Sequence, residues 1–381
     1  MKIGIVVPYF TPFVRGNEFG LADGLARLGQ DVTVITSTGK APREKMIKTD
    51  YKVDATHPFK VKYLWTPLDI AELPITPSVV GEIASSGYDV LLLQEDYQPI
   101  CHMACLAAKI KRTPTVLSTE RTYFPTGFKR LALGAFDLTV NVLTRRGATV
   151  YTAHCNAAKD FAESKLHVRP GRMQVVHVGV DAGLFKPTQG YTPLTEGDFK
   201  ILTVARLHPY KGLDMLIRAM AKVKERHPGA ILYIMGRGPM AVELKTLVNR
   251  LNLQDTVKFV ESPVPNTDMP AVYSSADLYV QPSNVEPYGI AVLEAMACGK
   301  PAICSRVGGM KDTVDDGITG FLVEASDVGA LAEKIEILAG DRQKLEAMGV
   351  AARKRVETKF DWPVIARQYL DIAKDITGKR S

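Results

Sequence analysis

The stretch EPYGIAVLEAMACGKPAI, residues 286–303, decides the fold of the second half of the chain. Its run from Tyr288 to Glu294 predicts the opening of a helix, and a helix start offers unpaired N–H groups and a partial positive charge that suit a phosphate. Glu286 lies just before this start, and seven residues separate it from Glu294. A glycine stop and a proline then lead into an apolar strand. The stretch therefore indicates positive backbone groups between two carboxylates that can bind hydroxyls.

Outward from this stretch, short β-rich runs alternate with helical patterns, which predicts an α/β chain with parallel sheets built from βαβ units. The strands predicted in the first half are 3–7, 32–36, 61–64, 90–93, 115–118, 149–152 and 174–177. Those predicted in the second half are 201–205, 232–235, 257–260, 278–281, 302–304 and 320–323. Residues 182–198 contain Pro, Gly and Thr without periodicity and are interpreted as a linker.

The composition indicates a globular protein of two domains. A length of 381 residues suits two domains of roughly 180 residues each. No window approaches ~18 uninterrupted apolar residues, so no transmembrane helix is expected, and the first apolar run is interpreted as a buried strand. The five cysteines show no metal-ligand spacing, which favours free thiols, a cytoplasmic protein and no metal site. The net charge of +7 fits acidic ligands or an acidic surface, and no nucleic-acid partner is expected.

Two cations follow the first strand of the second half. Arg206 stands at the carboxyl end of that strand, and Lys211 lies at the start of the next helix. An arginine suits bidentate contact with a phosphate and a lysine supplies a point charge, so the pair could neutralise a diphosphate without a metal. A solvated loop would also carry two such cations. The glycine turns at 236–238 and 308–309 are interpreted as mainly structural.

Together, the R-x4-K pattern and residues 286–303 resemble the signature of the retaining glycosyltransferases of family 4, also called glycosyl transferases group 1. The resemblance covers nearly the whole chain, and its motifs are specific in the second half. It implies the GT-B fold, in which two Rossmann-like domains face a cleft. The expected parts are an acceptor-side domain at 1–185, a nucleotide-sugar domain at 186–360 and a last helix at 361–381 that packs back on the first domain.

The resemblance also implies a function. The expected activity is retaining transfer of a sugar from a UDP- or GDP-sugar to a hydroxyl of a lipid-linked, saccharide or small-molecule acceptor, without a cofactor. By the resemblance, Arg206 and Lys211 bind the diphosphate, Glu286 binds the sugar hydroxyls and Glu294 binds the ribose. The residues that match the family's donor site are Gly16, Arg206, Lys211, Glu286, Tyr288, Gly289, Ile290 and Glu294. The alternatives are a disaccharide phosphorylase of the same fold and a catalytically silent sugar-nucleotide-binding protein.

The first half departs from the family pattern at two places. Arg15 replaces the first of two usual glycines, although Gly16 still allows close backbone approach. Glu120 stands where many relatives have a histidine near the donor sugar. This carboxylate either acts catalytically, by holding sugar hydroxyls or steadying positive charge at the anomeric carbon, or pairs with Arg121 and has no catalytic role.

Two further features of the first half bear on the acceptor. The acids at 95 and 96 follow a strand and are expected to be exposed loop residues, with binding of hydroxyls or of a cation as the alternative. The segment 128–146 mixes apolar and basic residues. It either lies on an anionic membrane surface, which would place the protein at the inner face of the membrane, or forms a core-facing helix with basic ends.

Overall fold

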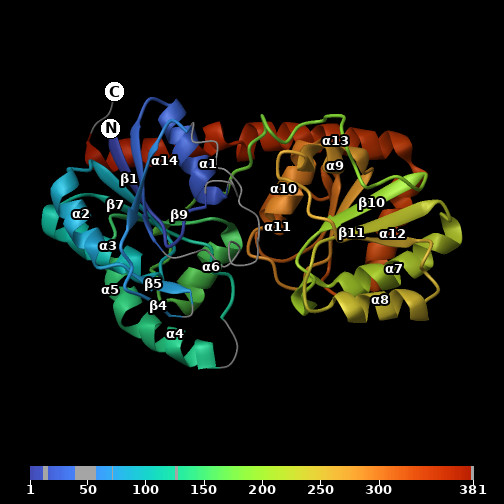
Figure 1. Cartoon of the computed structure of the whole chain (residues 1–381), viewed down its shortest axis with the longest axis horizontal. Helices are drawn as coiled ribbons and strands as arrows, with labels where there is room; N and C mark the ends of the chain where they lie inside the picture. Colours follow the sequence, from blue (N-terminus) through green and yellow to red (C-terminus); the bar gives the residue numbers. More distant parts are fainter. Residues whose placement is uncertain (12–15, 39–56, 71, 125–127, 379–381) are drawn as a thin grey trace. The chain divides into compact units, whose positions relative to one another are not determined.

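The chain forms two compact units in the computed structural model, which describes residues 1–11, 16–38, 57–70, 72–124 and 128–378, with side chains except those of 128–132 (Figure 1). The first unit comprises Met1–Gly179 and Trp362–Ser381, and the second comprises Val180–Asp361. The sequence interpretation placed these boundaries after residues 185 and 360.

The first unit is built on a parallel sheet of seven strands in the order β3-β2-β1-β6-β7-β8-β9. Its central strands are buried on both faces, which explains why they are continuous apolar runs. All seven predicted strands are present, with ends shifted by one or two residues. They are β1 (Lys2–Val6), β2 (Asp31–Ser37), β3 (Lys60–Leu64), β6 (Val90–Gln94), β7 (Thr115–Thr119), β8 (Val150–Ala153) and β9 (Met173–Val175).

Helices connect these strands. Each crossover between parallel neighbours needs a long connection, and helices fill most of them. The helices of this unit are α1 (Asn17–Arg27), α2 (Ser78–Ser86), α3 (Pro99–Lys111), α4 (Phe128–Leu138), α5 (Val140–Gly147), α6 (Asn156–Lys165) and α14 (Trp362–Thr377). A short antiparallel hairpin, β4 (Leu68–Ile70) and β5 (Leu73–Ile75), was not predicted.

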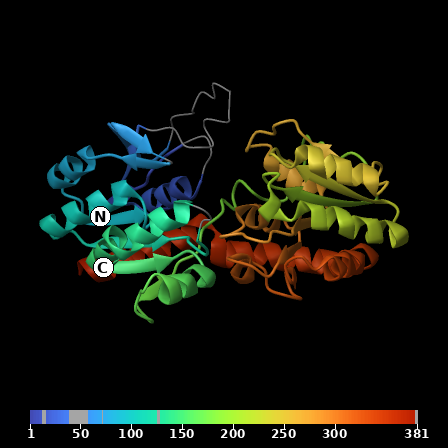
Figure 2. The same cartoon turned by 90° about the horizontal axis from the view of Figure 1, so that it is seen from below.

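The last helix, α14, packs against α1 and so joins the first sheet, as Figures 1 and 2 show. Its buried residues recur every three or four positions, from Ile365 to Ala373, and form one apolar face. Its first residue, Trp362, packs against Gly20 of α1 and against Gly179, where the first stretch of this unit ends. A Cβ on Gly20 would come within 2.0 Å of the indole, and one on Gly179 within 2.6 Å, so both positions need glycine for this packing.

The second unit has a parallel sheet of six strands in the order β12-β11-β10-β13-β14-β15, and all six predicted strands are present. They are β10 (Phe199–Val204), β11 (Ala230–Met235), β12 (Val257–Val260), β13 (Leu278–Gln281), β14 (Ala302–Ser305) and β15 (Gly320–Val323). The helices are α7 (Leu213–Arg226), α8 (Ala241–Arg250), α9 (Met269–Ser275), α10 (Ile290–Ala297), α11 (Met310–Thr313), α12 (Val328–Gly340) and α13 (Arg342–Arg355). One core joins the sheet to α7, α8, α12 and α13.

Each unit is thus a Rossmann-like α/β layer structure, as the sequence predicted. Within the described ranges, no helix combines the length and the apolar character that crossing a bilayer requires.

Candidate active site

The predicted donor residues of the second unit follow the carboxyl ends of β10 and β13. In a parallel sheet these ends share one edge, where open α/β sheets bind their ligands. Arg206 and Lys211 lie in the β10–α7 connection, and Glu286 lies between β13 and α10. The two connections are hydrogen-bonded to each other, because the Asn284 amide donates to the Tyr210 carbonyl at 2.8 Å. The fold therefore brings together two motifs that are 75 residues apart in sequence.

Lys211 and Glu286 form a direct ion pair. The Nζ of Lys211 lies 2.5 Å from an Oε of Glu286, and both side chains are nearly buried, at 12% and 11% exposure. The same Glu286 oxygen accepts a 2.7 Å hydrogen bond from Nε2 of Gln281. The sequence assigned these residues separate roles and did not reveal the pair. Gln281 could have been noticed as a polar residue at the end of the apolar strand β13, where it is 2% exposed.

Arg206 is exposed, and its guanidinium contacts the side chain of Tyr210. Tyr210 was not predicted from the sequence as a site residue. The Arg206 guanidinium donates to the Tyr210 hydroxyl at 2.6 Å and lies 5.9 Å from the ring centroid. Lys211 lies 5.3 Å from the same ring, so one tyrosine contacts both predicted diphosphate cations. Contact with the ring face favours cations and restricts their orientation.

Close glycine contacts fix the loops around this pair. Gly212 has a φ of +63°, and a Cβ there would lie 2.2 Å from the carbonyl oxygen of Pro282. Gly308 has a φ of +50°, and a Cβ there would lie 1.6 Å from the carbonyl oxygen of Glu286. The Gly309 amide also donates to the Pro287 carbonyl at 2.9 Å. The turn at 308–309 is therefore a packing element, as the sequence analysis interpreted it.

The helix after Glu286 begins two residues later than predicted. Helix α10 starts at Ile290, and Gly289 caps it with a left-handed φ of +88°. Because that conformation is costly for residues with a Cβ, the glycine marks the turn into the helix rather than its interior. Tyr288 is 3% exposed and packs inward, while Ile290 is exposed.

Glu294, on α10, accepts a 2.6 Å hydrogen bond from the hydroxyl of Tyr273 on α9. Burial, and then the neighbouring Glu294 carboxylate, raise the pKa of the Tyr273 hydroxyl well above its ordinary value. The tyrosine therefore stays protonated and holds the carboxylate in place.

The glycine turn after β11 packs against the Arg206 loop, in agreement with its structural interpretation. A Cβ on Gly236 would lie 1.9 Å from the Ala205 carbonyl oxygen, and one on Gly238 would lie 2.3 Å from that of Leu207. The Leu207 amide donates to the Arg237 carbonyl at 2.9 Å.

In the first unit, Gly16 lies at the N-terminus of α1, and Arg15 falls outside the described residues. The Glu18 carboxylate folds back toward this end, since a Cβ on Gly16 would lie 3.1 Å from one of its oxygens. An acidic residue in the first turn is favoured by the helix dipole.

Glu120 is exposed after β7, close to Glu95 after the neighbouring strand β6. Burial, then the charges of Glu120 and Asp96, raise the pKa of the half-buried Glu95 carboxyl well above its ordinary value. The backbone of Glu95 has a left-handed φ of +82°. Among the described residues, no hydrogen-bond partner reaches its buried Oε2.

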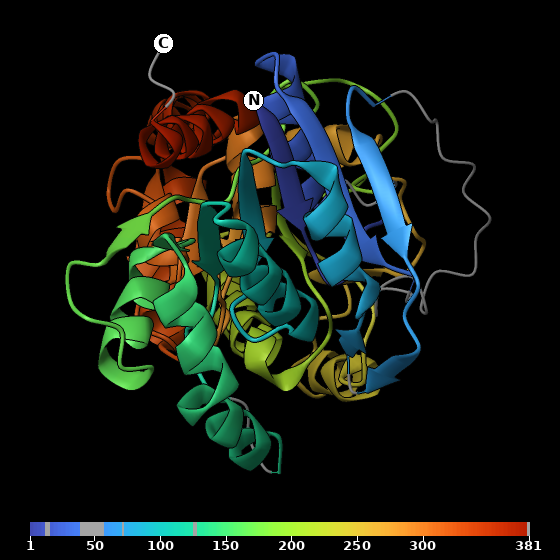
Figure 3. The ribbon, with the colours of Figure 1, turned by 90° about the vertical axis from the view of Figure 1, so that its left-hand side faces the viewer.

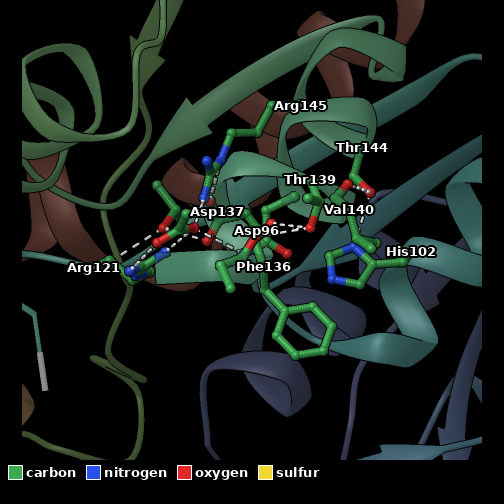
Figure 4. Close-up of polar contacts among 12 residues, drawn as sticks. Asp96, His102, Arg121, Phe136, Asp137, Thr139, Val140, Thr144 and Arg145 are labelled. Carbon is green, nitrogen blue, oxygen red and sulfur yellow. Dashed lines mark hydrogen bonds and ion pairs between the residues drawn. The ribbon is translucent and has the colours of Figure 1, made fainter. Parts of the chain in front are cut away.

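The expectation that the acids at 95 and 96 are exposed is wrong, because Asp96 is 0% exposed and belongs to a buried ion network (Figure 4). Asp96 accepts from Arg145 at 2.8 Å and from the Tyr151 hydroxyl at 2.7 Å. Arg145 also donates to Asp137 at 2.6 Å. Arg121 donates through both terminal nitrogens to Asp137, at 2.8 and 2.9 Å, so its charge is balanced there. The physical reason is that buried charges need partners, and these come from α4 and α5.

This network also shows which residues of segment 128–146 face inward. Asp137 and Arg145 point inward and hold α4 and α5 on the ends of β6 and β7. Phe136, Leu138 and Leu143 are exposed, at 50%, 70% and 71%. The two helices therefore have a polar buried side and an apolar outer side, and contact of this segment with a membrane stays a prediction.

Within the described part of the chain, no three His, Cys, Asp or Glu side chains are grouped in a way that could hold a metal ion. In the second unit, Arg206 and Lys211 bring positive charge to this edge of the sheet, together with the N-terminus of α10.

Two family models match the chain. Residues 19–184 match Glycosyltransferase Family 4, and residues 189–355 match Glycosyl transferases group 1. The chain is 36% identical over 187 residues to the GDP-mannose-dependent alpha-(1-6)-phosphatidylinositol monomannoside mannosyltransferase of Mycolicibacterium smegmatis, a match that covers 47% of this chain and 48% of that protein. It is 32% identical over 217 residues to the D-inositol 3-phosphate glycosyltransferase of Kribbella flavida, covering 53% and 50%. The chain thus spans about half the length of these curated relatives.

A full-length match is found with an uncharacterized glycosyltransferase of Methanocaldococcus jannaschii, at 28% identity over 98% of both chains. Among solved structures, Anabaena HepE in complex with UDP aligns with a TM-score of 0.78 at 23% identity, over 98% of this chain and all of that one. The sucrose-phosphate synthase of Thermosynechococcus elongatus aligns with a TM-score of 0.77 at 22% identity, over both entire chains. These likenesses show the fold.

Proposed function

The chain belongs to glycosyltransferase family 4 and has the GT-B fold, and on this basis we propose that it moves a sugar from a nucleoside diphosphate donor to a hydroxyl acceptor with retention of anomeric configuration. The observation that carries the proposal is the contact between Lys211 and Glu286. It joins a cation suited to a diphosphate to a carboxylate suited to sugar hydroxyls, at the edge of the sheet where such ligands bind.

The diphosphate is the leaving group in this proposal. Arg206, Lys211 and the N-terminus of α10 stabilise the negative charge that develops on it, which is where preorganised positive groups accelerate a reaction most. Tyr210 holds both cations in position before the donor arrives. No bound metal takes part in this scheme.

The two carboxylates bind the ends of the donor. Glu286, oriented by Lys211 and Gln281, accepts hydrogen bonds from hydroxyls of the transferred sugar. Glu294, held by Tyr273, accepts from the ribose hydroxyls. The turn at Tyr288, Gly289 and Ile290 lies between them in sequence and contacts the diphosphate. We also propose Gly16, in the first unit, as a donor-binding residue.

The chemical step is attack from the face that the diphosphate leaves. The acceptor oxygen forms its bond to the anomeric carbon as the bond from that carbon to the diphosphate oxygen breaks. The acceptor proton passes to the departing phosphate oxygen, so no enzyme nucleophile is needed. Glu120 steadies the positive charge that develops at the anomeric carbon, from its exposed place beside Glu95.

The donor is a UDP- or GDP-sugar, and the acceptor is a lipid-linked, saccharide or small-molecule hydroxyl. The relatives support both bases, because one is named GDP-mannose-dependent and one solved neighbour holds UDP. The relatives that act on a phosphatidylinositol mannoside and on an inositol phosphate support an acceptor of the polyol type.

The proposal is tested by incubating the protein with UDP- and GDP-linked hexoses and following the anomeric protons by NMR. We expect one donor to be turned over slowly by water, with release of the sugar in the donor's original configuration. Release of the opposite configuration would overturn retention. Sugar release from a disaccharide only when inorganic phosphate is supplied would identify the phosphorylase alternative, and nucleotide binding without turnover would identify a silent binding protein.

A further inference from the structure

Helices α3 and α5 pack side by side on the first sheet, with α4 continuing beyond α5 (teal and green in Figure 3). Nδ1 of His102 on α3 lies 2.8 Å from the Thr144 hydroxyl on α5, and the Cys105 thiol lies 3.7 Å from the Thr144 carbonyl oxygen. These contacts fix which sides of the two helices meet. Helix α3 also packs against α2 and the sheet, and the solvent-facing sides of α3 and α5 are here called the α3–α5 face.

Large apolar side chains are exposed on the α3–α5 face. Leu106 and Ile110 lie one turn apart on α3 and are 61% and 73% exposed. Val140 and Leu143 lie one turn apart on α5 and are also exposed. Apolar area left in water is unfavourable, so a face with several such residues favours a partner that covers them.

The same face carries cations and no acids. Neither α3 nor α5 contains an Asp or a Glu. Lys109, Lys111 and Arg112 at the end of α3 are exposed, as is Arg146 on α5. The acids packed beneath this region, Asp96 and Asp137, are buried and already paired with Arg145 and Arg121, so they do not offset these charges.

A cavity of about 220 Å³ opens between the end of α3 and the starts of β7 and β8. Two of the cations, Lys109 and Arg112, line it together with the hydroxyl residues Thr113, Thr115 and Thr149. Lysine, arginine and hydroxyl groups are donors that suit the oxygens of a phosphate ester. The helix dipole by itself explains basic residues at the end of α3, but it does not explain the exposed leucine and isoleucine beside them.

We propose that the α3–α5 face docks on an anionic phospholipid surface. Leu106, Ile110 and Leu143 enter the boundary between headgroups and acyl chains, and the cavity beside Lys109 and Arg112 seats a lipid phosphate. A basic surface with apolar side chains is what binds in this plane of a bilayer. A second copy of the chain fits this face less well, because self-association would bring two cationic surfaces together. The inference does not depend on the transfer chemistry.

The test is sedimentation of the full-length protein with sucrose-loaded vesicles of phosphatidylcholine, with and without phosphatidylglycerol. We expect binding only to the vesicles that contain phosphatidylglycerol, and less of it at high salt. The variant K109Q/R112Q is expected to bind about 25-fold more weakly, because each cation near a charged membrane contributes roughly a factor of five. The variant L106S/I110S should bind more weakly to the same vesicles.

The matched controls lie on the second unit. R218Q/K222Q removes two positive charges from α7, and V242S/V350S removes two exposed apolar side chains from α8 and α13. Both controls should bind like the unmodified protein. The proposal is overturned if the unmodified protein ignores phosphatidylglycerol, if K109Q/R112Q binds as its control does, or if glycerol phosphate stabilises the protein while vesicles do not bind. A shift in mass to a dimer that these variants abolish would assign the face to self-association instead. Nucleotide binding by the same variants separates a failure here from a failure of the proposed function.

Discussion

At the scale of single residues, charge and burial together decide which carboxylates can act. Glu286 is paired with Lys211, and Glu294 is held by a protonated tyrosine. Glu95 differs from both, because it is half-buried and its pKa is raised by burial and by Glu120. Its protonated form is therefore favoured in the folded state beyond its usual pH range.

The pKa shift of Glu95 predicts how stability depends on pH. The folded state binds more protons than the unfolded state between the ordinary and the raised pKa, so stability falls as pH rises through that window. Glu95→Gln keeps the neutral shape and removes the titration. We expect urea denaturation from acid to neutral pH to show a smaller loss of stability for this variant than for the unmodified protein. The same slope in both proteins would contradict the assignment, and Glu225→Gln, at an exposed position on α7, serves as the control.

At the scale of elements, the strands were predictable and the long-range contacts were not. Buried parallel strands are apolar runs bounded by turn residues, so β1 and β10 are visible in the sequence. The hairpin β4–β5 was missed because each strand has only three residues, those of β4 are all exposed, and β5 has a single buried residue. The start of α10 was placed too early because Tyr288 is apolar enough to continue the helical pattern, while the left-handed Gly289 prevents it.

The candidate site was predictable to the same extent. Arg206, Lys211 and Glu286 were singled out because they follow strands, and Glu294 because it lies on the helix after Glu286 in the stretch that resembles the family signature; their roles stay predictions. The pairing of Lys211 with Glu286 depends on how two loops pack, which local spacing does not encode. The same is true of Asp96 and Arg145, which meet across 49 residues.

The contact between the 308–309 turn and the Glu286 loop predicts a defect in donor binding. Gly308→Ala would place a Cβ 1.6 Å from the Glu286 carbonyl oxygen and must displace that loop. We expect it to weaken nucleoside diphosphate binding in a thermal-shift assay. Gly317→Ala is a matched control, since Gly317 also has a positive φ, +80°, but nothing lies within 4 Å of its Cβ position. Equal nucleotide binding by the two variants would argue against the loop contact.

The packing of α14 on α1 predicts a stability defect. Gly20→Ala would place a Cβ 2.0 Å from the Trp362 indole, and overpacking of this kind costs about 1–3 kcal/mol. Gly81→Ala on α2 meets nothing within 4 Å and should leave stability unchanged or raise it by up to ~1 kcal/mol, because alanine favours helices. Chemical denaturation measures both. A Gly20→Ala variant as stable as Gly81→Ala would mean that α14 does not pack here.

At the scale of the whole molecule, the chain enters the second unit once and leaves it once. The second unit, Val180–Asp361, is continuous in sequence and has its own core, whereas the first needs α14 from the other end of the chain. A continuous unit with its own core is expected to fold alone.

We therefore predict that a fragment of residues 180–361 unfolds cooperatively and is stabilised by the same nucleoside diphosphate as the full chain. A fragment of residues 1–179, which lacks α14, should be less stable because it exposes the side of α1 that carries Gly20. Calorimetry of the two fragments compares them. A second-unit fragment without a cooperative transition would show that the donor site needs the first unit for its structure.

The most direct test of the central claim is isothermal titration of the full-length protein with UDP, GDP and ADP. The account predicts that either UDP or GDP binds. It predicts that Lys211→Ala and Glu294→Ala each weaken this binding by tenfold or more, about 1.4 kcal/mol, and that Lys222→Ala leaves it unchanged. Loss of a charged hydrogen-bond partner at a phosphate or a ribose accounts for an effect of this size. Binding of none of the three nucleotides, or binding that is unchanged in Lys211→Ala and Glu294→Ala, would contradict the assignment of this site to a nucleotide-sugar donor.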